Sequence, residues 1–257
     1  MAEQYSATST ELRDANLRRL ALRIATRAVL RRAHDLVGPI QPARRVVREP
    51  LQEPFRGELD EEATLENLIG KEFPEKEDWI TARREERRTE IVLMLDASLS
   101  MSGKNLALAS VSAAVVAFSV KSEDLAVIAF ESSARRLKAL GERATPARVV
   151  EQLMSQPARG FTNIEEALAA GRREVARGAM PRRVGLLITD GVFTAGNDPL
   201  PEAARFPRLY VLLTEDYMMD EALCARMARA GSGAVVRVRG YDDLPATMLR
   251  VVTQLLR

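Results

Sequence analysis

The residues best suited to chemistry in this chain are oxygen-bearing side chains that follow apolar segments. Asp96, Ser98 and Ser100 alternate directly after one apolar run, Asp190 follows a later run, and Thr162 lies between them in a Gly-Phe-Thr-Asn segment. Two carboxylates and three hydroxyls, without a histidine or a thiol, form an all-oxygen ligand set. Such a set suits a hard divalent cation such as Mg²⁺ rather than zinc or copper.

The single cysteine, Cys224, and the single histidine, His34, exclude several common kinds of site. An intramolecular disulfide and a zinc site built from several Cys or His residues are both impossible. His34 falls within a predicted N-terminal helix and offers Ser98 no general base, which disfavours serine-nucleophile chemistry. With 38 Lys and Arg against 36 Asp and Glu, the net charge of +2 gives no argument for nucleic-acid binding.

A phosphate-binding loop is also disfavoured. Gly103 and Lys104 match the end of such a loop, but position 98 is Ser where the loop needs Gly, and position 105 is Asn where it needs Ser or Thr. We therefore expect no ATP hydrolysis by this chain.

The elements that would position the oxygen ligands alternate between short apolar runs and helical segments. Expected strands are Ile91–Leu95, Leu125–Phe130, Val184–Thr189, Leu209–Leu213 and Ala234–Val238. Expected helices are Leu106–Val120, Thr145–Met154, Ile164–Arg177, Asp220–Ala230 and a C-terminal helix from Leu244 to Leu255. This alternation predicts an α/β fold: a mostly parallel sheet with helices on both faces, with Ala134–Leu140 as an antiparallel edge strand. Ligands of such sheets bind beyond the carboxyl ends of the strands.

The segment before this pattern has a different character. Thr8–Leu36 is predicted to be an arginine-rich helix docked on the main domain, and the alternative is a helix that binds a partner or an acidic surface. Four prolines within Gly38–Gly57 predict an extended connector, and Glu61–Ile69 is expected to form a short helix. The expected domains are therefore 1–88, a helical extension with a Pro-rich connector, and 89–257, the α/β domain.

The sequence also bears on location. No apolar run reaches the roughly 20 residues that span a bilayer. The acidic residues Glu3, Glu11 and Asp14 fit neither a secretory signal nor a transit peptide. The expectation is a cytoplasmic protein without a membrane span.

Three separate motifs carry a resemblance to a known family. Asp-x-Ser-x-Ser after a buried strand, Gly-x-Thr-Asn before a helix and Thr-Asp-Gly after a later strand together resemble the metal-ion-dependent adhesion site (MIDAS) of the von Willebrand factor A (VWA) domain. The resemblance implies a Rossmann-like VWA domain that binds Mg²⁺, or Mn²⁺, and takes an acidic residue of a partner protein as a further ligand. The metal ligands that it implies are Asp96, Ser98, Ser100, Thr162 and Asp190.

A finer resemblance extends the match toward the N-terminus. Gly57-Glu58-Leu59-Asp60, followed by Thr64-Leu65 and a charged run, is similar to bacterial CoxE-like proteins, whose VWA domains work beside MoxR-type AAA+ ATPases. The resemblance implies an adaptor with a chaperone-like role in metal or cofactor insertion or enzyme maturation. It does not cover the first 56 residues.

The chain departs from the family pattern at two positions beside the ligands. Leu99 and Phe161 stand where the family often has glycine. Together with Met101 they are expected to form an apolar rim that grips the partner; the alternative is that these side chains pack inward.

Three hypotheses follow for the function. The leading one is a non-enzymatic, metal-dependent protein-binding adaptor. A metal-dependent hydrolase of phosphate esters is the alternative, with Glu131, Glu215 and Asp216 as candidate acids or bases. A structural interaction protein with an empty site is the third. Metal-dependent capture, metal-dependent turnover and indifference to metal distinguish the three.

Overall fold

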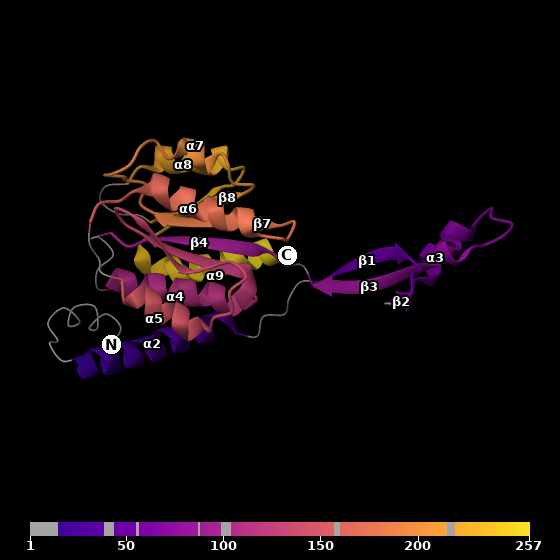
Figure 1. Ribbon diagram of the computed structural model, residues 1–257, viewed down its shortest axis with the longest axis horizontal. Coiled ribbons are helices and arrows are strands. Elements are labelled where there is room, and N and C mark those ends of the chain that lie inside the picture. Colours follow the sequence, from indigo (N-terminus) through magenta and orange to yellow (C-terminus); the bar gives the residue numbers. More distant parts are fainter. Residues whose placement is uncertain are drawn as a thin grey trace. The chain divides into compact units, whose positions relative to one another are not determined.

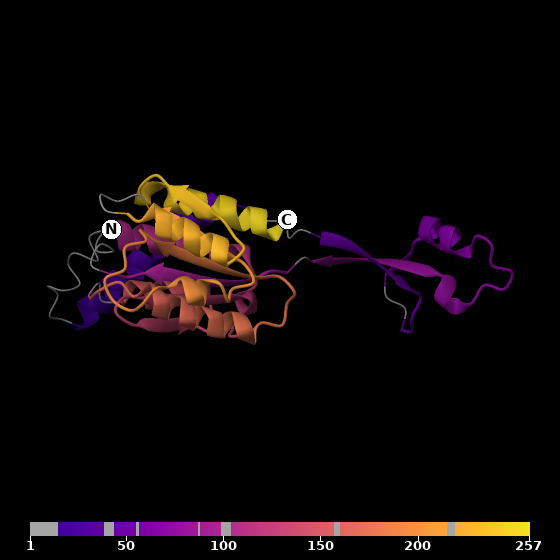
Figure 2. The same ribbon diagram turned by 90° about the horizontal axis from the view of Figure 1, so that it is seen from above.

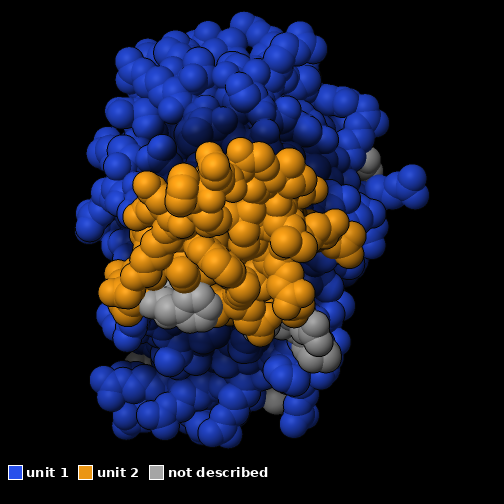
Figure 3. Space-filling view, turned by 90° about the vertical axis from the view of Figure 1, so that its right-hand side faces the viewer, with its two compact units in different colours: residues 1–40, 88–255 blue, residues 41–87, 256–257 orange. Residues whose placement is uncertain are grey.

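The chain forms two compact units, which Figure 3 colours separately. Our structure is a computed structural model, and it describes residues 15–38, 44–54, 57–86, 88–98, 104–156, 160–214 and 219–257. Unit 1 comprises residues 1–40 and 88–255, and unit 2 comprises residues 41–87 with the last two residues of the chain.

Unit 1 is built on a six-stranded sheet in the order β6-β5-β4-β7-β8-β9. Its strands are β4 (Glu90–Asp96), β5 (Leu125–Phe130), β6 (Ala134–Lys138), β7 (Arg183–Thr189), β8 (Leu209–Thr214) and β9 (Val235–Val238). All neighbours pair in parallel except β5 and β6, which are antiparallel. The predicted fold class, including the antiparallel edge strand, is confirmed. β4 is buried along its whole length, as expected for a strand with both faces covered.

Helices cover both faces of this sheet (Figures 1 and 2). They are α2 (Ala15–Val37), α4 (Lys104–Ser119), α5 (Pro146–Met154), α6 (Ile164–Arg177), α7 (Leu200–Ala203), α8 (Glu221–Ala230) and α9 (Leu244–Leu256). The helices α6, α7 and α8 lie on one face, and α4 and α9 lie on the other, where α2 and α5 pack on α4. None of the described helices is long and apolar enough to cross a bilayer.

Local sequence signals set where the helices near the carboxyl ends of the strands begin. The side chain of Asn163 accepts a hydrogen bond from the backbone N–H of Glu166 and caps α6. Asp220 caps α8 in the same way through the N–H of Leu223. Capping side chains satisfy backbone donors that the first helical turn leaves unpaired. Both helices therefore start at fixed points beside the ends of the strands.

The N-terminal helix belongs to unit 1. Its buried residues, Ala25, Thr26, Val29 and Ala33, recur at helical spacing and face α4 and α5. The predicted docking of this helix is therefore confirmed, although residues 8–14 of the expected helix lie outside the described residues. The compact units divide the chain differently from the expected boundary after residue 88, because this helix groups with unit 1.

Unit 2 contains a small antiparallel sheet in the order β1-β3-β2. Its elements are β1 (Arg44–Pro50), β2 (Glu58–Leu59), α3 (Glu61–Leu68) and β3 (Ile80–Glu86). The short helix that was expected here is confirmed as α3. The expected connector over Gly38–Gly57 instead contains β1, which as an edge strand needs only β3 as its partner and tolerates a terminal proline.

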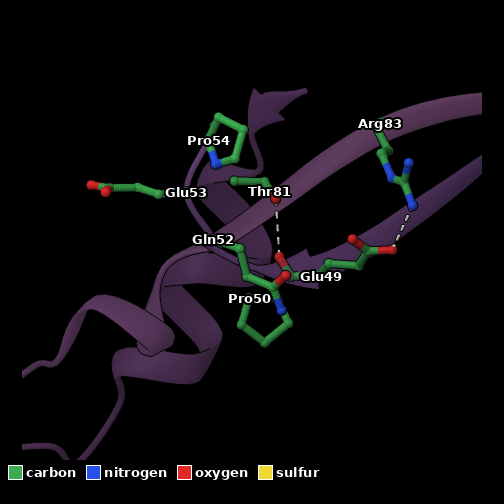
Figure 4. Close-up of a pocket in the computed structure, with 7 residues that line it drawn as sticks. All are labelled: Glu49, Pro50, Gln52, Glu53, Pro54, Thr81 and Arg83. Carbon is green, nitrogen blue, oxygen red and sulfur yellow. Dashed lines mark hydrogen bonds and ion pairs between the residues drawn. The ribbon is translucent and has the colours of Figure 1, made fainter. Parts of the chain in front are cut away.

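Two contacts of Glu49 tie β1 to β3 beside a polar hollow of about 350 Å³ (Figure 4). The hydroxyl of Thr81 donates to the carbonyl oxygen of Glu49 at 3.1 Å, and Nη2 of Arg83 donates to Oε1 of Glu49 at 2.9 Å. The carboxylate of Glu49 thereby pairs with the charge of Arg83 within the sheet.

Candidate metal site at the carboxyl edge

The centre of the sheet contains the point at which strand order reverses. β4 pairs with β5 on one side and with β7 on the other, so the chain builds outward from β4 in both directions. Asp96 is the last residue of β4, and Asp190 follows the last residue of β7. The two carboxylates therefore leave adjacent strands at the place where open α/β sheets bind ligands.

Asp96 is held from two sides and is only 5% exposed. Its Oδ1 accepts a 2.9 Å hydrogen bond from the backbone N–H of Ser98. Its Oδ2 makes a long, 3.5 Å contact with the hydroxyl of Thr189, which in turn accepts the N–H of Gly191 at 3.1 Å. Thr189 thus links the ends of the two strands. It stands within the Thr-Asp-Gly motif, but the sequence indicated no role for its side chain.

The loop that carries Asp190 is closed by contacts with α8. Oδ1 of Asp190 accepts the N–H of Val192 at 2.8 Å, and its main-chain oxygen accepts the N–H of Asp220 at 3.0 Å. Gly191 has a φ of +84°, and a Cβ there would lie 2.6 Å from the carbonyl oxygen of Asp220 and 2.7 Å from Sγ of Cys224. Only glycine fits this turn without strain.

Thr162 is buried in a segment held between two other loops. Its carbonyl oxygen accepts the N–H groups of Thr194 and Ala195, and its own N–H donates to the hydroxyl of Thr194 at 2.9 Å. The next N–H, of Asn163, donates at 2.8 Å to the carbonyl oxygen of Glu131, just beyond β5. These bonds join the loops that follow β5 and β7 to the segment before α6 at one edge of the sheet.

Four of the five sequence-predicted ligands are therefore found along this edge: Asp96, Ser98, Thr162 and Asp190. The fifth, Ser100, lies outside the described residues, as do Leu99 and Met101 of the expected rim and the candidate acids or bases Glu215 and Asp216. Phe161 is 64% exposed, so the alternative that it packs inward is wrong. That these residues bind a metal stays a prediction.

At this edge the carboxylates of Asp96 and Asp190 interact as like charges. Burial, aided by the negative charge of Asp190, raises the pKa of Asp96 to about 6, although hydrogen bonds from Ser98 and Thr189 oppose the shift. The influences on this pKa include no cationic side chain from the described part of the chain. Like charges brought together in a desolvated site favour protonation or an added cation.

The donor set fits a hard divalent cation. Among the described residues no three His, Cys, Asp or Glu side chains gather into a cluster, so protein ligands at this edge amount to two carboxylates and neighbouring hydroxyls. Mg²⁺ is commonly held by one or two carboxylates and keeps several waters. The oxygen chemistry and the small carboxylate number both match that preference.

The described structure also excludes two groups from acid–base or nucleophilic chemistry at this edge. The ring of His34 packs edge-on against Phe118 with centroids 6.1 Å apart, and Phe118 lies about 20 Å along α4 from Lys104, where α4 begins near the site. Cys224 is fully buried, and burial raises the pKa of its thiol to about 12, helped by the nearby charges of Asp220 and Asp190. Neither residue can serve as a base or nucleophile here.

Solved structures with the same fold include several VWA proteins. Proximal thread matrix protein 1 from the mussel byssus, in a structure with a zinc-occupied MIDAS motif, has a TM-score of 0.55 and 18% identity over 65% of this chain and 48% of that protein. A von Willebrand factor type A protein from Catenulispora acidiphila has a TM-score of 0.55 and 15% identity over 84% of this chain and 50% of that protein.

A third structure is shorter than these two. An aerotolerance-related membrane protein from Bacteroides fragilis has a TM-score of 0.50 and 19% identity over 65% of this chain and 98% of that protein. This chain spans about half the length of the mussel protein. The comparison with curated proteins gave no match.

Membership of a family rests on the sequence itself. The family model of VWA domain containing CoxE-like proteins matches residues 7–205, which is well over half of the chain. The match includes Asp96, Ser98, Ser100, Thr162 and Asp190 together with α2 and residues 41–87 of unit 2. The chain belongs to the family of VWA domain-containing CoxE-like proteins.

Proposed function

We propose that this chain is a non-enzymatic adaptor that binds a partner protein through a divalent cation at the carboxyl edge of its sheet. The observation that carries the proposal is the pair of carboxylates, Asp96 and Asp190, whose like charges come together on adjacent strand ends along the same edge as the hydroxyls of Ser98 and Thr162. Mg²⁺ is the proposed cation, with Mn²⁺ as its substitute.

The charge balance of the ligands explains why a partner is needed. Two carboxylates balance a divalent cation, and the hydroxyls of Ser98, Ser100 and Thr162 add no charge. The bound cation supplies an electrophilic centre with an affinity for one more anionic oxygen. We assign this place to an Asp or Glu of the partner. A single carboxylate gives modest affinity, so the exposed Phe161 beside Thr162 is proposed to add apolar contact.

The partner that we propose is a MoxR-type AAA+ ATPase, with which the chain would act in the cytoplasm during metal or cofactor insertion or enzyme maturation. Membership of the CoxE-like family supports this assignment. Lys104, the residue that most resembles a phosphate-loop lysine, makes a 2.6 Å ion pair with Asp242. ATP hydrolysis is therefore assigned to the partner.

Thermal unfolding with and without metal tests the site. Millimolar Mg²⁺ should raise the melting temperature, because a ligand that binds only the folded state stabilises it. Asp96→Ala should abolish the rise, whereas Asp35→Ala, which changes an exposed carboxylate on α2, should leave it unchanged. Equal responses of the wild type and Asp96→Ala to Mg²⁺ would rule out the site.

Capture of the purified ATPase tests the function. Binding should be lost in chelator, restored by Mg²⁺, and weakened by Asp190→Ala and by neutralising one acidic residue of the partner. Binding that persists through all of these changes places the contact elsewhere. Hydrolysis of p-nitrophenyl phosphate by the wild type but not by Asp96→Ala would instead support the hydrolase.

A further inference from the structure

Unit 2 presents an apolar surface surrounded by negative charge. Leu65, Ile69 and Phe73 are 66%, 80% and 82% exposed. Residues 58–78 carry nine carboxylates and only two lysines, and both lysines form ion pairs, with Asp78 and Glu53. A small unit with a three-stranded sheet leaves much apolar surface uncovered. The surface that remains is therefore both apolar and acidic.

The packing of α3 fixes which of its faces points outward. Its inner face is bonded to the start of β3: the hydroxyl of Thr64 accepts the N–H of Ile80 at 2.9 Å, and Nδ2 of Asn67 donates to the carbonyl oxygen of Asp78 at 2.9 Å. The outward positions carry apolar and acidic residues in turn. We call these exposed residues, with Phe73, the acidic face: Glu61, Glu62, Leu65, Glu66, Ile69 and Phe73.

The helix α2 has a second apolar stripe on the side away from its packing partners. Leu17, Leu20 and Ile24 follow one another at spacings of three and four residues and are 50%, 54% and 38% exposed. This spacing places them on one helix face, opposite the buried stripe that includes Ala25 and Val29. Exposed arginines share the outward side. We call this set the arginine face: Leu17, Leu20, Arg23, Ile24, Arg27 and Arg31.

We propose that the arginine face of one copy of this chain docks on the acidic face of unit 2 of a second copy. The two faces match in both respects, since each carries exposed aliphatic side chains flanked by charges of opposite sign. The second copy is the occupant because one chain carries both halves of the contact. This association goes beyond the metal-dependent capture proposed above, and it uses none of the residues of the carboxyl edge.

Such a contact joins two different surfaces, so each copy retains one free acidic face and one free arginine face. Heterologous contacts of this kind produce rings or open chains rather than closed dimers. The apolar stripes supply the contact area, and the charges set its partner and its orientation. The association should therefore depend on concentration and weaken with salt.

Sedimentation velocity of the full chain measures the association directly. The weight-average sedimentation coefficient should rise between about 1 and about 200 µM protein in about 0.05 M NaCl, and the rise should shrink in about 0.5 M NaCl, where the Debye length falls to a few Å. It should be the same in Mg²⁺ and in chelator. A coefficient that does not change with concentration overturns the proposal and leaves the faces to another protein or to a contact within one chain.

Charge reversal supplies a test that a general loss of solubility cannot mimic. One variant carries Arg23→Glu with Arg27→Glu, and the other carries Glu62→Lys with Glu66→Lys; all four residues are exposed. Each variant alone should stay monomeric, because its two faces now carry charge of the same sign. An equimolar mixture should associate again, because each variant then complements the other.

A matched control changes the same charge elsewhere on unit 1. Arg173→Glu with Arg208→Glu alters two exposed arginines, on α6 and just before β8. This variant should associate as the wild type does, and all variants should keep the wild-type melting temperature. If the two reversed variants fail to associate when mixed, or if either still associates alone, the two faces do not form the contact.

Discussion

The two ends of the six-stranded sheet differ in the groups that surround their buried charged side chains. At the amino end, several buried charged side chains of the described residues are held by ion pairs or hydrogen bonds within the chain. Asp124 pairs with the guanidinium of Arg88, and Glu174 accepts from Arg136 at 3.0 Å. Lys138, which is 1% exposed, places its Nζ within hydrogen-bonding distance of four backbone carbonyl oxygens, which its three N–H donors share. Buried charges that are paired and fully hydrogen-bonded hold neighbouring loops together.

At the carboxyl end, the buried Asp96 lies near a second, half-buried carboxylate. Asp96 receives hydrogen bonds from Ser98 and a contact from Thr189, while its carboxylate neighbour is Asp190. No cation from the described residues is among the influences on Asp96. The same sheet therefore pairs buried charges within the chain at one end and brings two carboxylates together at the other. Two like charges at a switch point indicate a site for an external cation.

The same chemical change at the two ends should have very different effects. Asp124→Asn removes one partner of a buried ion pair and leaves Arg88 without its carboxylate, which should cost about 3 kcal/mol of unfolding free energy. Asp96→Asn removes one of two like charges, so in chelator it should cost less than about 1 kcal/mol. Urea unfolding of both variants in chelator and in Mg²⁺ measures the difference.

The two variants should also differ in how much stability they gain from Mg²⁺. The wild type and Asp124→Asn should both gain stability from Mg²⁺, and Asp96→Asn should gain none. A loss of several kcal/mol for Asp96→Asn in chelator would show that its carboxylate is a structural anchor like Asp124. The contrast between the two ends would then be wrong.

The pH dependence of the unfolding free energy gives a second test of the difference between the two ends of the sheet. Asp96 has a pKa of about 6 in the folded chain against 3.8 for the ordinary carboxyl. Because the folded state binds this proton more tightly than the unfolded state, its ionisation destabilises the metal-free protein above pH 6. The penalty is fully present above about pH 7 and is relieved as the pH falls through 6 toward 4. It amounts to about 3 kcal/mol at most.

The difference between wild type and Asp96→Asn isolates this effect. Unfolding free energy in chelator, measured between about pH 8 and about pH 5, should rise for the wild type relative to the variant as the pH falls. In Mg²⁺ the relative trend should vanish or invert, because protons and metal compete for the same oxygens. Parallel curves in chelator would mean that Asp96 ionises as an ordinary carboxyl.

Most of unit 1 could be predicted from its sequence because its core is continuous and strongly periodic. Leu125–Phe130 and Ile164–Arg177 have the bounds that were expected, and Asn163 and Asp220 mark helix starts. Unit 2 could not be predicted as a sheet. The second half of β3 is a run of charged residues, Arg83–Glu86, and its partner β1 lies in a Pro-containing segment, so neither strand has a long apolar run of its own.

The site could be predicted where side chains themselves form the motif. Asp96 and Asp190 follow apolar runs that the sequence shows plainly. Thr189 and Thr194 could not be assigned a role, because each acts through a contact with another loop that only the folded chain brings near. For the same reason, the sequence could not decide whether Phe161 is exposed or packs inward.

The smallest expected change in stability belongs to Phe161, on the outer surface of the carboxyl edge. Its N–H donates to the hydroxyl of Ser132 at 3.0 Å, and the preceding Gly160 has a φ of +84°, a conformation that favours glycine. The backbone is therefore fixed while the ring is 64% exposed. Phe161→Ser should change unfolding free energy by less than about 0.5 kcal/mol.

If the rim grips the partner, the same substitution should weaken metal-dependent capture about tenfold, because an aromatic side chain at the edge of a contact contributes about 1.4 kcal/mol. The Mg²⁺-induced rise in melting temperature should stay as in the wild type, since no ligand is touched. Phe73→Ser, the same change at an 82% exposed ring in unit 2, is the matched control and should not alter capture of the partner. Titration calorimetry with the purified partner measures both variants. Equal affinities for the two would confine recognition at this edge to the cation and its ligands.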